Sequence, residues 1–333
     1  MKNSSKLKIV CIIHALSLGG MERVMSIILS DFSSRGEVEV SLLLIGRNRE
    51  IKFPLSKDVK VYKPDFPYVD SRRNRSTWKT GRFIRKTIKE INPDKVLSFG
   101  EIWNNLVLLS LFGLKFPVFV ADRSQPNKDL GKIHNWLRKK LYPGAAGLIV
   151  QTDKAKQIAR ENKWNKNIAV IGNPIRMISE NQEIQREKII LSVGRLIPTK
   201  NIGHLIEIFL NCEKNEDWKL IIVGGNGKKM NLLEEYRAEI KERGQEDKVQ
   251  LVGEQRDVDS YYIKSQIFAF TSTSEGFPNV IGEAMSAGLP VISYDCVAGP
   301  SEMIEQDVTG YLIPENDKVS FQEKLEKLMD SED

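Results

Sequence analysis

Cysteine and histidine are both scarce in this sequence of 333 residues, which holds three of each. Cys11, Cys212 and Cys296 lie far apart and form no CxxC or Cys/His pairing. Neither a disulfide framework nor a metal site is therefore predicted, and the scarcity fits a reducing compartment. Long apolar runs are also missing, because the longest runs, such as 106–112, fall well short of the roughly 20 residues needed to span a bilayer.

The first twenty residues superficially resemble a secretion signal, because lysines precede an apolar stretch. His14 interrupts that stretch, and the segment 19–23 stands where a small-residue cleavage site would be expected. We therefore expect residues 7–14 to form a buried first strand.

Opposite charges divide the chain into two halves. Hydrophobic residues make up 41% and charged residues 28%, a globular composition that excludes a disordered chain. Residues 1–170 hold 32 Lys and Arg against 15 Asp and Glu, a balance of +17. Residues 171–333 hold 18 against 29, a balance of −11, which leaves +6 overall. The contrast predicts two domains with different partners. No nucleic-acid recognition motif supports a nucleic-acid partner for the basic half, so none is expected.

Short apolar runs alternate with longer amphipathic segments, from a strand at 8–13 to a last predicted element, a helix at 300–305. This alternation predicts an α/β chain with parallel sheets and crossover helices. Two such series predict two doubly wound domains, 1–170 and 171–333, with a hinge in the turn cluster 171–174. Ligands of such sheets bind in the loops beyond the carboxyl ends of the strands.

A glycine pair, Gly19 and Gly20, follows the first predicted strand and opens a helix. Glycine lets the backbone approach a ligand closely, and a helix N-terminus offers unpaired N–H donors to a phosphate. The loop matches neither the GxGxxG fingerprint nor a Walker A motif. A tight strand–helix turn is the alternative interpretation.

Two cations, Arg195 and Lys200, stand between a predicted strand at 189–193 and a helix at 202–210. The arginine fork and the compact lysine charge suit the two phosphates of a diphosphate. The alternative is a pair of solvated surface charges.

Two glutamates, Glu275 and Glu283, flank the start of a helix predicted near Asn279 or Val280. A carboxylate binds the paired hydroxyls of a ribose or hexose well. An exposed loop charge and an ordinary first-turn glutamate are the alternatives.

These residues carry a resemblance. The stretches that carry it are GGMERV (19–24), SVGRLIPTKN (192–201), IIVGGNG (221–227), STSEGFPNVIGEAMSAGLPVIS (272–293) and VTGYLI (308–313). Together they resemble a retaining, nucleotide-sugar-dependent glycosyltransferase of family four, whose GT-B fold has two Rossmann-like domains facing a central cleft.

The resemblance implies that the second domain binds the donor. Arg195 and Lys200 would hold the diphosphate, and Glu275 would face the transferred sugar; these three are the expected catalytic residues. The expected donor-binding residues are Gly19, Gly20, Gly224, Gly225, Arg256, Gly276, Phe277, Pro278, Asn279, Val280 and Glu283. No metal and no cofactor beyond the donor is expected. The one DxD spelling, at 257–259, precedes a predicted helix, where Asp257 is expected as an N-cap.

Two departures from the family pattern bear on the acceptor side. Arg123 stands where many relatives have a histidine facing the sugar, and arginine cannot act as a base. It would hold an anionic acceptor group; a surface arginine paired with Asp122 is the alternative. His14 is the other acceptor-side residue. The sequence stops at Asp333, where relatives usually carry a helix that crosses back to the first domain. We expect the closing helix to be absent, and a truncated sequence is the alternative.

Two basic segments with interleaved apolar residues suggest an anionic membrane surface as a partner. They hold Arg72, Arg73, Arg75, Lys79, Arg82, Arg85, Lys86 and Lys89, and then Lys132, Arg138, Lys139 and Lys140. A solvated helix face is the alternative.

The expected function is transfer of a hexose or N-acetylhexosamine, from a UDP-sugar, to a glycan or lipid-linked acceptor. The reaction would serve surface polysaccharide or glycoconjugate assembly at the cytoplasmic face of the plasma membrane. A non-catalytic donor-binding subunit and a nucleotide-sugar 2-epimerase are the alternatives.

Overall fold

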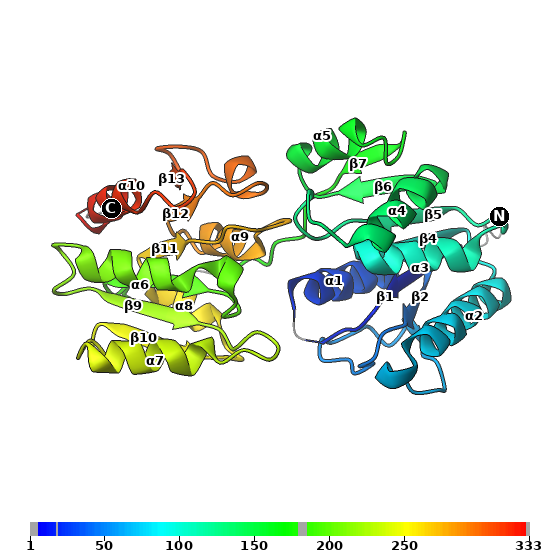
Figure 1. Ribbon diagram of the computed structural model, residues 1–333, viewed down its shortest axis with the longest axis horizontal. Helices are drawn as coiled ribbons and strands as arrows, with labels where there is room; N and C mark the ends of the chain where they lie inside the picture. The colour runs from blue at the N-terminus through cyan, green and yellow to red at the C-terminus, as the bar shows by residue number, and fades with distance from the viewer. Residues whose placement is uncertain (1–5, 18, 179–184, 331–333) are drawn as a thin grey trace. The chain divides into compact units, whose positions relative to one another are not determined.

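Strands rich in Val, Ile and Leu alternate with helices and assemble into two sheets of parallel strands (Figure 1). The computed structural model describes residues 6–17, 19–178 and 185–330. It divides the chain into two units, Met1–Pro174 and Ile175–Asp333, each with its own sheet. The predicted fold class, two doubly wound α/β domains, is confirmed.

The first unit contains a 7-stranded sheet in the order β3-β2-β1-β4-β5-β6-β7. Its strands are β1 (Leu7–Ile13), β2 (Val38–Leu44), β3 (Lys60–Tyr62), β4 (Lys95–Phe99), β5 (Val118–Ala121), β6 (Gly147–Val150) and β7 (Ile168–Val170). Its α-helices are α1 (Gly20–Ser34), α2 (Arg73–Ile91), α3 (Glu101–Leu111), α4 (Lys132–Leu141) and α5 (Asp153–Glu161). Val10 and Ile12 of β1 pack in one core with residues of α2, α3 and α5, whereas Cys11 and Ile13 pack with α1. Because neighbouring side chains of a strand point to opposite faces, helices cover both faces of this sheet.

The second unit repeats this arrangement in a 6-stranded sheet of order β10-β9-β8-β11-β12-β13. Its strands are β8 (Ile189–Val193), β9 (Lys219–Val223), β10 (Val249–Gly253), β11 (Ile267–Phe270), β12 (Val291–Tyr294) and β13 (Gly310–Ile313). Its α-helices are α6 (Ile202–Asn211), α7 (Leu232–Glu242), α8 (Asp259–Lys264), α9 (Asn279–Ser286) and α10 (Lys318–Met329). Ile190 packs in one core with residues of α6, α7 and α10, and Leu191 in another with α8 and α9.

Each sheet reverses its strand order once, between β1 and β4 in the first unit and between β8 and β11 in the second. Open parallel sheets bind ligands at such a reversal, beyond the carboxyl ends of the strands. A ligand site is therefore expected in the loops that follow β1, β4, β8 and β11.

The end of the second unit differs from the sequence-based assignment. The predicted helix at 300–305 is a short 3-10 turn, Pro300–Glu302, and β13 and α10 follow it without having been predicted. Helix α10 packs against α6 and β12, with Phe321 and Leu325 buried in the core. None of the described helices is both long and apolar enough to span a bilayer.

The three cysteines are all free and buried. Burial raises the pKa of each thiol, Cys11, Cys212 and Cys296, to about 12. A thiol with so high a pKa is almost entirely protonated at neutral pH, and the protonated thiol is a poor nucleophile.

Arg138 is a correction to the predicted basic surface. Its side chain is 4% exposed and forms an ion pair with Asp122, whose carboxylate also accepts a hydrogen bond from Tyr142 at 2.7 Å. The Arg138 guanidinium carbon lies 3.3 Å from the centre of the Trp164 ring. Arg138 is therefore a core residue, and Asp122 pairs with it rather than with Arg123.

Removing Arg138 tests this assignment. We expect Arg138→Ala to lower the free energy of unfolding by about 3–5 kcal/mol, because it leaves the Asp122 carboxylate buried without its partner. Lys139→Ala, at the exposed neighbouring position on α4, should change it by less than about 0.5 kcal/mol. Urea unfolding measures both, and equal effects of the two variants would contradict the burial of Arg138.

Candidate functional site

Two loops meet at the strand reversal of the second unit. The loop after β8 contains Arg195 and a 3-10 turn, Pro198–Lys200, and the loop after β11 contains Glu275. Main-chain hydrogen bonds join them, because Thr273 N donates to Thr199 O at 2.8 Å. The Thr271 hydroxyl donates to the carbonyl of Lys200 at 3.1 Å. The two loops therefore hold each other in place.

Lys200 and Glu275 form an ion pair across these loops. The Lys200 Nζ lies 2.5 Å from Glu275 Oε1, and the two side chains are only 18% and 13% exposed. Ser272, which is fully buried, contacts the same carboxylate oxygen at 2.6 Å through its hydroxyl. The Lys200 ammonium also lies 4.9 Å from the centre of the Phe270 ring. Lysine has three N–H donors, so the pair with Glu275 leaves others for a ligand.

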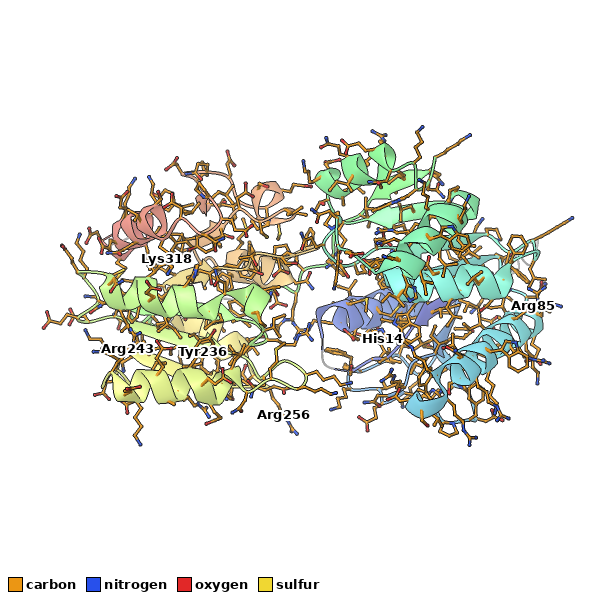
Figure 2. All side chains as sticks on the ribbon, in the orientation of Figure 1. His14, Arg85, Tyr236, Arg243, Arg256 and Lys318 are labelled. Atoms are coloured by element: carbon orange, nitrogen blue, oxygen red, sulfur yellow. The ribbon has the colours of Figure 1, made fainter. Side chains whose placement is uncertain are left out.

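Two further cations of the second unit, Arg195 and Arg256, are exposed to solvent. Both are exposed, and neither guanidinium has a hydrogen-bond or ion-pair partner within the described part of the chain. Arg195 follows β8 directly, and Arg256 lies in the loop after β10, where Figure 2 labels it. Because β8, β9 and β10 are parallel neighbours and each arginine follows the end of its strand, both arginines lie at the carboxyl edge of this sheet.

Gly224 allows the loops after β8 and β9 to touch. Its φ is +155°, and a Cβ placed on it would lie 1.8 Å from the Gly194 carbonyl oxygen. Leu196 N donates to the carbonyl of Gly225 at 2.8 Å, which continues the pairing past the strands. A Cβ placed on Gly225 would have more room, since the nearest atoms to it would be those of Glu254, at 3.4 Å or more.

Helix α9 begins at Asn279, as the sequence predicts, immediately after the segment Gly276–Phe277–Pro278. Pro278 stands at the N-cap of α9. Its side chain has no hydrogen-bond acceptor, so the N-cap residue does not satisfy the N–H groups of the first turn through its side chain. Ile281 N donates to the Pro278 carbonyl at 3.0 Å. The amide of Val280 lies in this first turn, where an anion is favoured.

Glu283 lies one turn into α9 and is buried, with its side chain 4% exposed. The Tyr262 hydroxyl donates to Glu283 Oε2 at 3.2 Å, and Arg176 Nη2 lies 3.9 Å from the same oxygen. Arg176 also forms an ion pair with Asp259. Sequence reasoning missed both Arg176 and Tyr262. The one available signal was an arginine two residues after the turn cluster 171–174.

The predicted residues of the first unit lie at the carboxyl ends of β1 and β5. Gly19 is the N-cap of α1, with extended backbone, and Gly20 is the first residue of the helix. His14 stacks on Trp103 with ring centres 5.7 Å apart, and its Nε2 lies 3.5 Å from Glu22 Oε1. Burial lowers the pKa of His14, and Glu22 partly opposes this effect.

Arg123 is a partly buried residue that packs over the Phe99 ring, 4.0 Å from the ring centre. Its Nη1 donates to Asn173 Oδ1 at 2.7 Å, and Glu101 accepts its main-chain N–H at 2.8 Å. Burial lowers the pKa of Arg123 to about 10, against the raising effects of Glu101 and Asp122. The alternative of a surface arginine paired with Asp122 is wrong, since Asp122 pairs with Arg138.

The DxD stretch acts locally within the second unit. Asp257 Oδ1 accepts a hydrogen bond from Ser260 N at 3.3 Å in the first turn of α8, and Asp259 pairs with Arg176. The N-cap of α8 is Val258, one residue later than predicted, and Asp257 accepts its hydrogen bond from the position before the N-cap.

Replacing Gly224 tests the close approach of the two loops. We expect Gly224→Ala to lower the free energy of unfolding by at least ~1–3 kcal/mol, because its Cβ meets a carbonyl oxygen and its φ is unfavourable for alanine. Gly36→Ala is the control, since a Cβ there has no atom within 4 Å. Urea unfolding of both variants is the measurement, and a neutral Gly224→Ala would show that the loops can separate without cost.

The chain is similar to known proteins over nearly its whole length. Residues 175–333 match the family described as "Glycosyl transferases group 1". The amylovoran biosynthesis glycosyltransferase AmsD of Erwinia amylovora is 30% identical over 336 residues, which cover 98% of this chain and 91% of AmsD. A protein of Campylobacter jejuni named GalNAc-alpha-(1->4)-GalNAc-alpha-(1->3)-diNAcBac-PP-undecaprenol alpha-1,4-N-acetyl-D-galactosaminyltransferase is 26% identical over 335 residues, covering 98% of this chain and 90% of that protein.

Solved structures of glycosyltransferases share the fold. The lipopolysaccharide outer core galactosyltransferase WaaB in its apo form has a TM-score of 0.74 at 22% identity, covering 97% of this chain and 90% of WaaB. A structure of TarM from S. aureus has a TM-score of 0.79 at 15% identity, covering 98% and 93%. Taken with the identity to AmsD over nearly the full length of both proteins, these likenesses show that the chain belongs to the group 1 glycosyl transferases of family four and is a glycosyltransferase with the GT-B fold.

Proposed function

We propose that this glycosyltransferase moves a hexose or N-acetylhexosamine from a UDP-sugar to a glycan or lipid-linked acceptor, with retention of the anomeric configuration. The observation that carries the proposal is the Lys200–Glu275 pair at the strand reversal, beside the exposed charge of Arg195. The pair puts a cation for phosphate and a carboxylate for sugar hydroxyls within 2.5 Å of each other.

The donor diphosphate would contact Arg195 and Lys200, and its negative charge matches their two positive charges. The Val280 amide in the first turn of α9 would donate to the same diphosphate or to the sugar. Glu283 would accept hydrogen bonds from the ribose hydroxyls, and Arg256 would lie near the base. These roles follow the family resemblance and agree in chemistry with the side chains present.

The reaction would proceed by departure of the nucleoside diphosphate. The bond between the anomeric carbon and the phosphate oxygen breaks, and its electron pair goes to the phosphate. Negative charge builds on that oxygen, where preorganised cations stabilise the transition state most. The acceptor oxygen then bonds to the anomeric carbon on the same face, and its proton passes to the departing phosphate. Arg195 and Lys200 would supply the positive charge without a metal ion.

The acceptor is proposed to be a glycan or a lipid-linked saccharide in surface polysaccharide or glycoconjugate assembly. Support comes from the names of relatives, since AmsD is a biosynthetic enzyme of amylovoran and the Campylobacter protein is named for an undecaprenol-linked substrate. In the first unit, Arg123 and His14 remain the acceptor-side candidates.

A basic-aromatic surface on the first unit supports a membrane partner. Helices α2, α3 and α4 pack side by side in that order (Figure 1). Their exposed large apolar side chains are Trp78, Ile102, Leu109, Ile133 and Trp136, and the exposed Phe112 follows α3 directly. The exposed cations of α2 and α4 are Arg73, Arg75, Arg82, Lys86, Lys89, Lys132, Lys139 and Lys140. Arg85 is a partial exception, because it donates to the carbonyls of Ser110 and Phe112 at 2.9 Å. We propose peripheral binding at the cytoplasmic face of the plasma membrane.

Alanine variants test the donor site. We expect Arg195→Ala and Lys200→Ala each to slow transfer by about 10²–10³-fold, because each removes a donor that stabilises the leaving phosphate. Glu275→Ala should abolish measurable transfer, because it removes the carboxylate that is proposed to face the transferred sugar. The assay is release of UDP from UDP-hexoses and UDP-N-acetylhexosamines, with and without a lipid extract that supplies lipid-linked saccharides.

The matched control is Arg243→Ala. Arg243 directly follows α7, is exposed and forms a surface ion pair with Glu239 (Figure 2). Near-normal turnover of all three site variants would show that the site is wrongly assigned. Binding of UDP-sugars by the wild-type protein without any UDP release would instead favour a non-catalytic donor-binding subunit.

Liposome flotation tests the membrane partner. The protein should float with anionic vesicles at low salt and dissociate at high salt. Lys86→Ala/Lys140→Ala should weaken binding by about 30-fold, since each cation near an anionic surface contributes ~1 kcal/mol. Arg243→Ala should bind as the wild type does. Binding that is absent, or indifferent to salt, would sink the proposal.

A further inference from the structure

A short segment, 175–178, begins the second unit and runs along helix α9. Gly282 of the helix admits it, because a Cβ there would lie 2.7 Å from Ile175 Cδ1. The Ser286 hydroxyl donates to the Arg176 carbonyl at 3.1 Å, and Ile178 N donates to the Ser286 hydroxyl oxygen at 3.2 Å. Contacts of the main chain therefore fix the position of Arg176 relative to this helix.

The Arg176 guanidinium reaches two carboxylates on two helices. Its Nη1 contacts Asp259 of α8, and its Nη2 lies 3.9 Å from Oε2 of Glu283 in α9. Tyr262 donates to that same Oε2 at 3.2 Å. A planar fork with several donors can serve two carboxylates at once, which the single ammonium of lysine does less well.

Glu283 depends on such partners because it is buried. A carboxylate taken out of water is costly unless a cation and hydrogen bonds accompany it. Loss of the Arg176 cation would remove one constraint on the Glu283 carboxylate, and rotation of that carboxylate would disturb its alignment with a bound diol. Arg176 acts here through Glu283 and not by contact with the ligand.

We infer that Arg176 is a positioning residue that keeps the Glu283 carboxylate oriented toward the ribose of the nucleotide. The inference rests on the proposed ribose-binding role of Glu283. Tyr262 is the second member of this arrangement and holds the same carboxylate oxygen from α8. The orientation of the Glu283 carboxylate thus depends on Arg176, the second residue of the second unit.

A binding cycle tests the inference. The nucleoside diphosphate among UDP, GDP and ADP that raises the melting temperature most is titrated by calorimetry, together with its 2′-deoxy form. The wild type should bind the ribose form about 10- to 100-fold more tightly, since a hydrogen bond to a charged group contributes that much. In Arg176→Ala this preference should shrink to less than about threefold, whereas Arg243→Ala should keep the full preference.

Two further variants protect the test from a folding defect. Arg176→Lys keeps the positive charge but not the fork, and it should retain part of the ribose preference. Tyr262→Phe keeps the shape of the buried ring and should lose part of it. Both should melt close to the wild-type temperature.

The outcomes separate the two ideas. A wild type that prefers the ribose form while Arg176→Ala, Arg176→Lys and Tyr262→Phe all prefer it equally would overturn the role of Arg176 and leave the donor site standing. A wild type and Glu283→Ala that both bind the two nucleotides equally would overturn the ribose role itself, and with it the inference.

Discussion

Strands β8 and β11 lie side by side and parallel, although the two are far apart in the sequence. The carboxyl ends of both strands therefore lie at the same edge of the sheet, and the loops that follow the two strands meet there. The hydrogen bonds from Thr271 and Thr273 to the turn at Thr199–Asn201 complete this meeting. This meeting of the two loops brings Lys200 and Glu275 into contact, and the proposed chemistry depends on that pair. The constraint is one of topology, since neither loop would define this geometry alone.

Buried charge is organised differently in the two units. In the first unit, Arg138 and Arg123 lie in or near the core, where Asp122, Trp164, Phe99 and Glu101 surround them. The count of +17 for the basic half thus overstates the charge that reaches the surface. In the second unit, which is acidic overall, Arg195 and Arg256 are exposed without described partners. Net charge therefore indicates how the domains differ, but only the contacts show which cations a ligand could meet.

Sequence reasoning recovered the fold class and the start of α9, because strand–helix alternation and glycine-rich turns are local patterns. It also selected Lys200 and Glu275, through spacing and family resemblance, and the structure brings these two into contact. It missed Arg176 and Tyr262, because the contacts of Arg176 with α9 join residues as much as 110 apart in the chain. It misplaced Arg138 on the surface, because a charged residue on an amphipathic helix is usually exposed and its partner Asp122 lies on another segment. Helix α10 was not recognised either, although its buried residues Phe321, Leu325 and Met329 recur every four residues, which is the spacing of one helix face.

The burial of all three cysteines makes the chain well suited to site-specific labelling. Thiols whose pKa is raised to about 12 react slowly with maleimides at neutral pH. A single cysteine introduced at an exposed position of each unit would then be the reactive pair in an otherwise silent background. Fluorophores on such a pair would report the distance between the two units in solution, with and without a nucleotide, and no native cysteine would have to be removed first.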